Sequence, residues 1–482
     1  MKLRELLAGV PICAGSADLE MEISGVSYDS RTTRPGDLFV AMTGFATDGH
    51  QYIAKALANG AAAVLCQRRP AEACAYVQTE DSRRALAVIG GNWFGHPAEE
   101  MTMIAVTGTC GKTTTTYLLK AILEQARGAK VGLIGTNQNM IGSDVIPTER
   151  TTPESFEVQK LFREMADAGC THVVMETSSH ALYLDRVYGV RYDVGIFTNL
   201  TQDHLDFHKT MENYCDAKAI LFRNCVTGVV NADDPWTPRL LKDADCKVMT
   251  YAEQADADLR AENIVLSAGG IAFDAVSGAE RVPIRVNIPG GFMVYNTLDV
   301  LGAALALGIS LEESAVVLAK VPHVKGRVEI VPTPGKDYTI LIDYAHTPDS
   351  MVNVLQTVKE FAKGRTVAVF GCGGDRDRTK RPLMGKAAAD WSDFAVVTTD
   401  NPRTEEPEAI IADILPGFDG SATPYRVVVD RIEAIHWAMD HAETDDVIVL
   451  CGKGHETYQE VNHVKHHMDE REIVADYLSS GR

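Results

Sequence analysis

Short apolar runs alternate with helix-length segments along most of the chain. A continuous apolar run over residues 101–107 leads into a glycine turn and a long helix that begins near Lys112. Such runs are typical of strands buried on both faces, and strands that alternate with helices favour a mostly parallel sheet covered by helices. We therefore predict an α/β fold, with further strands at 130–134, 172–175, 194–197 and 228–231, and again at 339–342, 366–370, 394–397 and 447–450.

Two breaks in this pattern divide the chain. Its 482 residues suggest about three domains. The polar segment 96–100 precedes the first series of long apolar runs, and Gly326 precedes the second series. We predict an N-terminal domain over 1–98, with a strand at 36–42 and a helix at 53–58, a central domain over 99–325 and a C-terminal domain over 326–482.

Charge and cysteine content limit the classes of partner. Acidic residues outnumber basic ones by 66 to 46, which gives a net charge of −20. This surplus argues against binding nucleic acid or an anionic membrane by bulk electrostatics, so local donors must hold any anionic ligand. No run approaches the roughly 18 apolar residues that cross a bilayer. The ten cysteines form no CxxC pair, so we expect a soluble cytoplasmic protein without stable membrane insertion.

A glycine-rich segment between the first long apolar run and its helix indicates a phosphate site. Residues 107–114 are Thr-Gly-Thr-Cys-Gly-Lys-Thr-Thr. Glycines let backbone N–H groups approach phosphate oxygens, and the helix N-terminus adds partial positive charge. Lys112 can reach the β- and γ-phosphates, and the Thr113 hydroxyl can ligate Mg²⁺. A turn that merely needs glycine is the weaker alternative, because Gly-Lys-Thr stands in the register of a shortened Walker A motif.

Polar residues follow two neighbouring predicted strands. Glu176 comes directly after the strand 172–175, and His204 lies shortly past the strand 194–197. Ligands gather at the carboxyl ends of strands in open α/β sheets. His204 alone is better explained as a hydrogen-bonded structural residue, but together with Glu176 and Thr113 it is equally well explained as a metal ligand.

Several motifs occur together and in order. The phosphate loop is followed by ETSSH at 176–180, NLTQDHLD at 199–206 and YCDAK at 214–218. This combination resembles the Mur ligases, the ATP-dependent amide ligases that build the peptidoglycan stem peptide. The resemblance implies three domains, with a central P-loop ATPase-type, mostly parallel sheet and a Rossmann-like C-terminal domain. It extends to the C-terminal motifs DYAHTP at 343–348, GCGGDRD at 371–377 and DNPR at 400–403.

The C-terminal motifs narrow the resemblance to family members that add a diamino acid. It implies that ATP phosphorylates the D-glutamate γ-carboxylate of UDP-MurNAc-L-Ala-D-Glu, and that the amine of meso-2,6-diaminopimelate attacks the acyl phosphate. Two Mg²⁺ ions are implied, together with a Lys218 carbamylated by CO₂, which requires a lysine whose ammonium form is disfavoured by burial. Without the resemblance, Lys218 would be taken for a solvated helix lysine. The implied catalytic residues are Lys112, Glu176, His204 and Lys218, and the implied metal ligands are Thr113, Glu176, His204 and the Lys218 carbamate.

The resemblance also implies three sets of binding residues. The ATP set is Gly108, Thr109, Cys110, Gly111, Lys112, Thr113, Thr114, Asn296, Arg327, Asp343 and His346. The UDP-sugar set is Tyr28, Ser30, Thr151, Thr152, Ser178 and Arg186. The diaminopimelate set is Arg376, Asp400, Asn401, Pro402, Arg403, Gly452 and Glu456.

Charges in the diaminopimelate set favour that substrate over L-lysine. Diaminopimelate carries a second carboxylate and ammonium at its far end, so Arg403 and Arg376 can pair with the carboxylate while Glu456 accepts from the ammonium. Lysine lacks the distal carboxylate, and we expect an unpaired buried arginine to reject it. Without the resemblance, the DNPR segment would be taken for a common turn.

Some positions depart from the family pattern. Cys110 stands where asparagine is usual, which should leave backbone cradling of phosphate intact, and Leu184 and residues 45–47 differ on the uridine side.

The alternative functions are those of a lysine-adding homologue, more remotely of a folylpolyglutamate synthetase, or of a non-catalytic P-loop regulator. The Arg403 loop argues against the first two, and retention of Glu176, His204 and Lys218 argues against the third.

Overall fold

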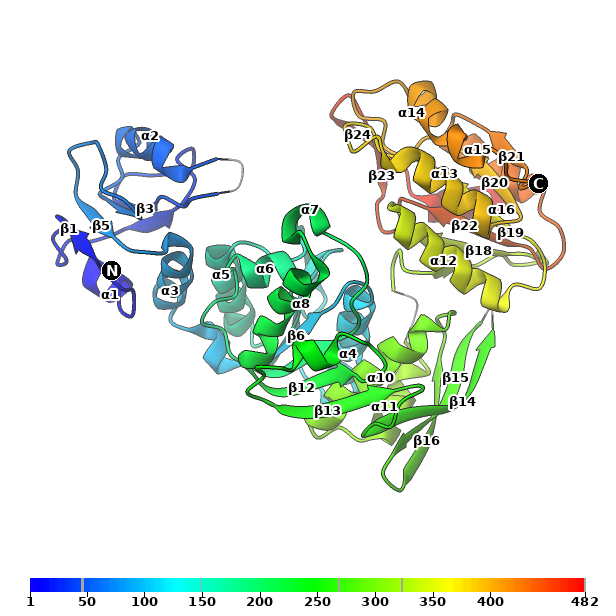
Figure 1. Ribbon diagram of the computed structural model, residues 1–482, viewed down its shortest axis with the longest axis horizontal. Coiled ribbons are helices and arrows are strands. Elements are labelled where there is room, and N and C mark those ends of the chain that lie inside the picture. Colours follow the sequence, from blue (N-terminus) through cyan, green and yellow to red (C-terminus); the bar gives the residue numbers. More distant parts are fainter. Residues whose placement is uncertain (45–46, 149, 268, 322–323, 481–482) are drawn as a thin grey trace. The chain divides into compact units, whose positions relative to one another are not determined.

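The computed structural model describes residues 1–44, 47–148, 150–267, 269–321 and 324–480 (Figure 1). Phe45 and Ala46, which depart from the family pattern, lie outside the described residues. The three domain boundaries expected from the sequence stay a prediction. The chain forms two compact units: the first is Met1–Tyr251 with Ala255–Ala257 and Gly302–Gly308, and the second is Ala252–Gln254, Asp258–Leu301 and Ile309–Arg482.

The N-terminal part of the first unit is a five-stranded sheet in the order β1-β5-β4-β3-β2, with β1 antiparallel to β5 and the other pairs parallel. Helix α3 (Ser82–Phe94) begins where the Asp81 carboxylate accepts from two backbone N–H groups, and it ends at Gly95 in the left-handed region. The expected strand at 36–42 and helix at 53–58 are confirmed. The remaining elements are α1 (Leu3–Leu6), β1 (Ala14–Gly15), β2 (Gly25–Ser27), β3 (Asp37–Val40), α2 (Ile53–Ala58), β4 (Ala63–Cys66) and β5 (Tyr76–Gln78).

A larger sheet in the first unit is organised around β6 (Thr102–Thr107), which pairs in parallel with β10 (His172–Glu176) and β11 (Tyr192–Phe197). Because parallel strands point the same way, the carboxyl ends of these three strands share one edge of the sheet. The five strands predicted between 101 and 231 all form, with ends shifted by up to three residues. The neighbours are β7 (Val131–Ile134), β12 (Cys225–Asn231) and β13 (Lys247–Ala252), all parallel, and antiparallel β8 (Asn139–Ile141) and β9 (Asp144–Ile146).

Helices connect these strands, as the α/β prediction requires. The longest of them, α4 (Lys112–Arg127), follows β6 directly and contacts β6, β7 and β10. It buries Leu118, Leu119, Ile122 and Leu123, which recur at helical spacing on one face. The other helices are α5 (Ser155–Asp167), α6 (Ser179–Tyr183), α7 (Leu205–His208), α8 (Met211–Ala219) and α9 (Thr237–Leu240).

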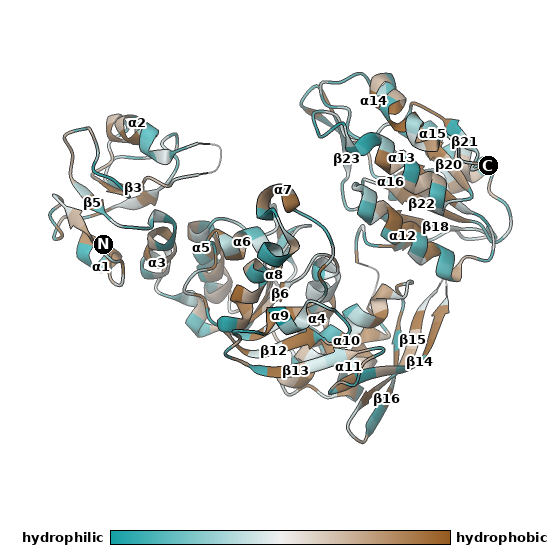
Figure 2. Ribbon diagram, in the orientation of Figure 1, coloured by the Kyte–Doolittle hydropathy of each residue, from teal (hydrophilic) through white to brown (hydrophobic). Residues whose placement is uncertain are grey.

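The second unit contains three antiparallel strands that the apolar runs did not predict. They are β14 (Leu259–Ser267), β15 (Gly270–Ser277) and β16 (Glu280–Val286). Exposed and buried residues alternate along β16, so hydrophilic and hydrophobic residues alternate there too (Figure 2). Strands with one solvated face lack the continuous apolar run by which we recognised the parallel strands. Helices α10 (Phe292–Ala306) and α11 (Leu311–Leu318) follow them.

The C-terminal part of the second unit is a six-stranded sheet in the order β17-β18-β22-β19-β20-β21, in which β17 alone is antiparallel. Alternate strand residues belong to two hydrophobic clusters: Leu341 packs with α12 and α13, whereas Ile340 and Ile342 pack with α15 and α16. Both faces of the sheet are therefore covered. The elements are β17 (Glu329–Val331), β18 (Thr339–Asp343), α12 (Pro348–Phe361), β19 (Thr366–Phe370), α13 (Lys380–Trp391), β20 (Phe394–Val397), α14 (Pro407–Ile414), β21 (Tyr425–Val427), α15 (Arg431–Asp440), β22 (Val447–Cys451), β23 (Tyr458–Val461), β24 (Val464–His467) and α16 (Glu470–Ser479).

These observations confirm the predicted α/β class and the four C-terminal strands. Within the described residues, no helix combines the length and the apolar character that a bilayer span requires.

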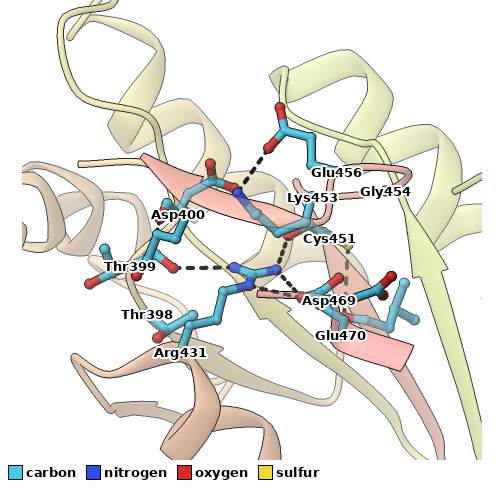
Figure 3. Close-up of polar contacts among 12 residues, drawn as sticks. Thr398, Thr399, Asp400, Arg431, Cys451, Lys453, Gly454, Glu456, Asp469 and Glu470 are labelled. Carbon is cyan, nitrogen blue, oxygen red and sulfur yellow. Dashed lines mark hydrogen bonds and ion pairs between the residues drawn. The ribbon is translucent and has the colours of Figure 1, made fainter. Parts of the chain in front are cut away.

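A buried ion pair between α15 and α16 also holds the chain just past the ends of β20 and β22 (Figure 3). Arg431 and Glu470 are each 1% exposed, and Arg431 Nε donates to Glu470 Oε1 at 2.9 Å. The same guanidinium donates to the backbone oxygens of Cys451 at 2.8 Å and Thr399 at 3.4 Å. Arg431 therefore fixes the chain where β20 and β22 end, which is where the loops of the predicted amino-acid site begin.

Replacing Arg431 with leucine should destabilise the second unit by about 3–5 kcal/mol, because Glu470 would be left buried without its partner. Urea unfolding followed by circular dichroism measures this loss. Replacing both Arg431 and Glu470 with leucine should recover most of it. The matched control is Arg281→Leu, which removes an exposed arginine paired with Glu262 and Asp274 and should change little. If Arg431→Leu lowered the free energy of unfolding no more than Arg281→Leu does, the structural role of Arg431 would be contradicted.

Candidate functional site

The phosphate loop connects the end of β6 to the start of α4. Gly108 and Gly111 have φ values of +154° and +90°. A Cβ on Gly108 would lie 1.8 Å from Thr198 Oγ1, so this position requires glycine. Thr109 N donates to Asn199 O at 2.9 Å, and Thr113 and Thr114 are buried in the first turn of α4.

Asn199 holds the loop at Cys110. The Cys110 N–H donates to Asn199 Oδ1 at 2.9 Å, and Asn199 Nδ2 donates back to the Cys110 carbonyl at 3.2 Å. Thr198 Oγ1 donates to the same carbonyl at 2.6 Å. The loop is thus fixed through its backbone, while Cys110 itself is exposed, which fits the expectation that cysteine there leaves the cradle intact. Asn199 stood in a motif of the sequence, yet it was missing from the predicted site residues.

Glu176 is held by donors from two other segments. It is 1% exposed, and its Oε1 accepts from Thr113 Oγ1 and from the Thr136 N–H, both at 2.9 Å. Thr136 Oγ1 donates to Oε2 at 2.8 Å. The structure therefore brings Thr113 and Glu176 into direct contact, as their place on neighbouring strand ends predicted. Thr136 was not predicted, because a single threonine after a strand carries no motif.

Two lysines converge on one carbonyl of the phosphate loop. Lys112 Nζ donates to Gly108 O at 2.9 Å, and Lys218 Nζ donates to the same oxygen at 2.7 Å. Lys218 is 1% exposed on α8 and lies 4.4 Å from the centre of the Tyr214 ring. Burial, and next the charge of Lys112, hold the pKa of Lys218 well below the ordinary lysine value. The structure thus shows a lysine whose ammonium form is disfavoured by burial, which the sequence could not show.

His204 lies at the rim of this group. It has a φ of +53° just before α7 and is half exposed, with Nε2 3.5 Å from Asp203 Oδ2. Its ring centre lies 6.1 Å from that of Tyr214, whose hydroxyl is 3.2 Å from Thr109 Oγ1. Tyr214 therefore lies between His204 and the phosphate loop.

The donors fit a magnesium ion better than a softer metal. In the part of the chain that the structure describes, no three histidine, cysteine, aspartate or glutamate side chains gather as a metal site. The Thr113 hydroxyl and the Glu176 carboxylate are hard oxygen donors, which suit Mg²⁺, and Mg²⁺ usually completes its shell with water and phosphate oxygens. Lys218 would contribute oxygen only as a carbamate.

The central residues of the predicted UDP-sugar set adjoin Glu176. Thr152 Oγ1 donates to the Glu176 backbone oxygen at 2.8 Å, and Thr151 Oγ1 is 3.0 Å from Thr136 Oγ1. Arg186 Nη1 donates to Thr152 O at 3.1 Å. Ser178 caps α6, which Leu184 follows directly, and the Ser178 N–H donates to Thr152 Oγ1 at 3.2 Å. Four predicted residues from three segments thus meet beside the phosphate loop.

The N-terminal members of the set are less directly connected. Tyr28 and Glu157 interact electrostatically, and burial is the main cause that raises the pKa of both groups. Ser30 is buried, and its carbonyl accepts from Asn59 Nδ2 at 2.7 Å. Glu154 links the two parts of the unit, since its carboxylate lies 3.5 Å from both Arg83 and Arg186.

In the second unit, Arg327, His346 and His455 surround Tyr344; we call these four residues the Tyr344 cluster. The Tyr344 ring centre lies 4.5 Å from that of His346, 4.9 Å from that of His455 and 5.4 Å from Arg327 Cζ. Asp343, just before it, accepts from the Val328 N–H at 2.9 Å, and burial raises its pKa. Asn296, also predicted for ATP, is buried on α10 with Nδ2 3.8 Å from Met293 Sδ, and it is not part of the cluster.

The predicted diaminopimelate residues, apart from Pro402, line a cavity of about 230 Å³ at the carboxyl ends of β18, β19, β20 and β22. Parallel strands bring these loops together although they span about eighty positions of sequence. The lining also includes Tyr344 and His346, so part of the predicted ATP set borders it. The charged residues of the lining are Arg376, Lys380, Asp400, Arg403 and Glu456, and only Lys380 lies outside the predicted set.

One expectation about this cavity is wrong. Arg403 is not unpaired: its Nε donates to Glu460 Oε2 at 3.1 Å and its Nη1 to Gly374 O at 2.7 Å. Lysine would therefore not leave this guanidinium without a partner, and desolvation of a bare arginine cannot exclude it. Arg376, whose Nη1 donates to the Asp375 carbonyl at 3.1 Å, is exposed. Glu460 was missed because it lies outside every motif.

Comparison with known proteins places the chain. Three family models match it: the Mur ligase middle domain at residues 106–304, the glutamate ligase domain of Mur ligases at 326–454, and the Mur ligase family catalytic domain at 22–92. The chain belongs to the Mur ligase family. The resemblance inferred from the motifs is thereby confirmed.

Relatives within this family cover nearly the whole chain. A UDP-N-acetylmuramoyl-L-alanyl-D-glutamate–2,6-diaminopimelate ligase from Clostridium botulinum is 48% identical over 95% of both chains. The enzyme of that name from Caldanaerobacter subterraneus is 46% identical over 99% of both chains. A solved structure of a UDP-N-acetylmuramoyl-L-alanyl-D-glutamate–2,6-diaminopimelate ligase matches with a TM-score of 0.73 at 32% identity. The match covers 100% of this chain and 99% of the chain in that structure. Folylpolyglutamate synthase from Mycobacterium tuberculosis, at 19% identity and a TM-score of 0.61 over 77% of this chain and 92% of its own, shares the fold.

His455 of the Tyr344 cluster should titrate far below an ordinary histidine. Burial, followed by the charge of Arg327, lowers its pKa from 6.5 to about 4. Below pH 6.5 the unfolded chain therefore binds a proton at this residue that the native state does not bind. His455 thus lowers the free energy of unfolding as the pH falls from 6.5 to 4. Histidine Cε1–H NMR, with His455→Gln to assign the signal, measures the pKa. The exposed His467, whose pKa is raised by Glu472, is the internal control; a His455 midpoint near 6.5 would contradict the burial of the neutral ring.

Proposed function

We propose that the chain is an ATP-dependent ligase that adds meso-2,6-diaminopimelate to the D-glutamate of UDP-MurNAc-L-Ala-D-Glu in peptidoglycan precursor synthesis. The observation that carries this proposal is the cavity in the second unit, where Arg403, Arg376 and Glu456 offer charges complementary to the distal carboxylate and ammonium of diaminopimelate. The names of relatives that match nearly the whole chain support it. A cytoplasmic location is part of the proposal, because the ten cysteines of the sequence form no CxxC pair and show no dense spacing, as is usual for proteins of a reducing compartment.

In the first half-reaction, the γ-carboxylate oxygen of D-glutamate attacks the γ-phosphorus of ATP, and ADP leaves. The backbone N–H groups of residues 108–113 cradle the phosphates, and Lys112 exchanges its bonds to Gly108 O and Thr109 O for phosphate oxygens. Thr113, Glu176, His204 and a carbamylated Lys218 would hold Mg²⁺, which supplies charge neutralisation at the transferred phosphoryl group. Thr151, Thr152, Ser178 and Arg186 orient the nucleotide-sugar next to this group.

In the second half-reaction, an amine nitrogen of diaminopimelate attacks the acyl carbon, the C–O bond to phosphate breaks, and the amine loses a proton. Asp400, Asn401, Arg403 and Glu456 position the amino acid for this attack. Exclusion of water protects the acyl phosphate from hydrolysis. The lysine-adding alternative shares all of these steps and differs in the fit of the distal group.

Phosphate release should depend on the amino acid. With ATP and UDP-MurNAc-L-Ala-D-Glu, we expect rapid release with meso-diaminopimelate, little with L-lysine, and a background rate with neither. Positional isotope exchange in ATP should require the dipeptide substrate but not diaminopimelate, because the acyl phosphate forms first. Release driven by lysine would favour the lysine-adding alternative, release indifferent to the amino acid would defeat the ligase proposal, and no release under any condition would favour a P-loop regulator.

Lys218→Ala should lower kcat by about 100-fold, since a residue that would hold Mg²⁺ at the transferred phosphoryl group is lost. Added formate or acetate should restore part of the activity if the missing group is a carbamate. The matched control is Lys120→Ala, another buried lysine of the same unit, which pairs with Glu124 one turn further along α4. Steady-state rates over a series of carboxylate concentrations provide the measurement, and a fully active Lys218→Ala variant would refute the carbamate.

A further inference from the structure

Lys453 is a fully buried lysine, and it is not among the predicted site residues. It follows β22 in a turn between Gly452 and Gly454, both of which have positive φ values. Its side chain is 0% exposed, and its Nζ donates to Asn401 Oδ1 at 2.7 Å and to Glu456 Oε2 at 2.8 Å (Figure 3 shows Lys453 with Glu456). An ammonium in such a place must be fully paired, and both partners belong to the diaminopimelate set.

The two partners of Lys453 also bind one another. Asn401 Nδ2 donates to Glu456 Oε2 at 3.0 Å, which closes a ring of three hydrogen bonds. Asn401 Oδ1 additionally accepts from the Glu460 N–H at 2.9 Å. Each side chain of the ring is therefore held by the other two, and a change of rotamer in any one would break two bonds.

The two carboxylate oxygens of Glu456 have different surroundings. Oε2 already accepts from Lys453 and Asn401, whereas Oε1 is 3.5 Å from the Tyr458 hydroxyl. Glu456 is 14% exposed and lines the cavity. An ionised carboxylate has lone pairs for about four donors, so Oε1 can accept from a substrate ammonium while Oε2 stays anchored.

The backbone of the two loops does not depend on Lys453. Arg431 binds the carbonyls of Thr399 and Cys451, the residues just before Asp400 and Gly452 (Figure 3). The Gly374 N–H donates to Asn401 O at 2.9 Å, and the Gly452 N–H donates to Asp343 O at 3.0 Å. Loss of the Lys453 ammonium should therefore release the side chains of Asn401 and Glu456 while the loops stay in place.

We propose that Lys453 is a positioning residue that fixes Glu456 and Asn401 and thereby sets the preference for a substrate with a distal ammonium. The proposal rests on the proposed function. Lys453 itself does not touch the substrate, because its side chain is enclosed; it acts through Glu456 Oε1. Its loss should weaken recognition of the distal ammonium more than recognition of the rest of the amino acid.

The test compares meso-diaminopimelate with 2-aminopimelate, which keeps both carboxylates and the reacting amine but lacks the distal ammonium. In Lys453→Met, the ratio of kcat/KM for the two substrates should fall by about tenfold, through a higher KM for diaminopimelate. KM for ATP should stay nearly constant. Lys453→Gln keeps one donor and should show an intermediate ratio, and it decides the matter if the methionine variant does not fold. Lys465→Met is the matched control, since the Nζ of this exposed lysine lies 4.1 Å from the centre of the Tyr458 ring, and Lys453 Nζ lies 5.3 Å from the same centre.

A merely structural Lys453 would reduce kcat/KM for both substrates equally and leave the ratio unchanged, which would overturn the inference. A wild-type enzyme that accepts both substrates equally would also overturn it, because Glu456 would then not recognise the ammonium, while the proposed function would stand. Failure of the proposed function has a different signature, namely no phosphate release by the wild-type protein with diaminopimelate, and it would remove this inference as well. Non-additive effects of Lys453→Met and Glu456→Gln on the ratio would support action through Glu456.

Discussion

Charge that is buried at the carboxyl ends of parallel strands is the constraint on which both sites depend. Glu176, Lys218, Arg431 and Lys453 are each nearly or fully enclosed, and each must be compensated by hydrogen bonds, because an unpaired charge in the interior is very unfavourable. Each has at least one partner in a segment far away in sequence. Every such residue therefore ties a site loop to the rest of its unit.

The two units meet this constraint in different ways. In the first, Glu176 accepts from three donors, whereas Lys218 shares the Gly108 carbonyl with Lys112 and burial disfavours its ammonium form, as the proposed carbamylation requires. In the second, Lys453 and Arg431 are paired with Glu456 and Glu470, which suits groups that only hold others in place.

Much of the fold could be predicted because parallel strands are buried on both faces. The strand 366–370 was predicted to the residue, and 101–107 to within one. The antiparallel strands β14–β16 escaped notice, because their solvated face breaks up the apolar run. At the site, motif residues such as Thr113 and Glu176 could be named in advance, but Thr136, Glu460 and Lys453 could not, because each acts through contacts with segments distant in sequence.

The sequence by itself determined the family, the α/β class, the phosphate loop and the order of the motifs, since these rest on residue types at short spacing. Tertiary structure alone decided how the charges are paired. It paired Arg403 with Glu460, buried Lys218 beside Lys112, and closed Asn401, Lys453 and Glu456 into one ring. The physical reason is that burial and pairing depend on neighbours in space, and a parallel sheet assembles these from strand ends that lie tens of residues apart.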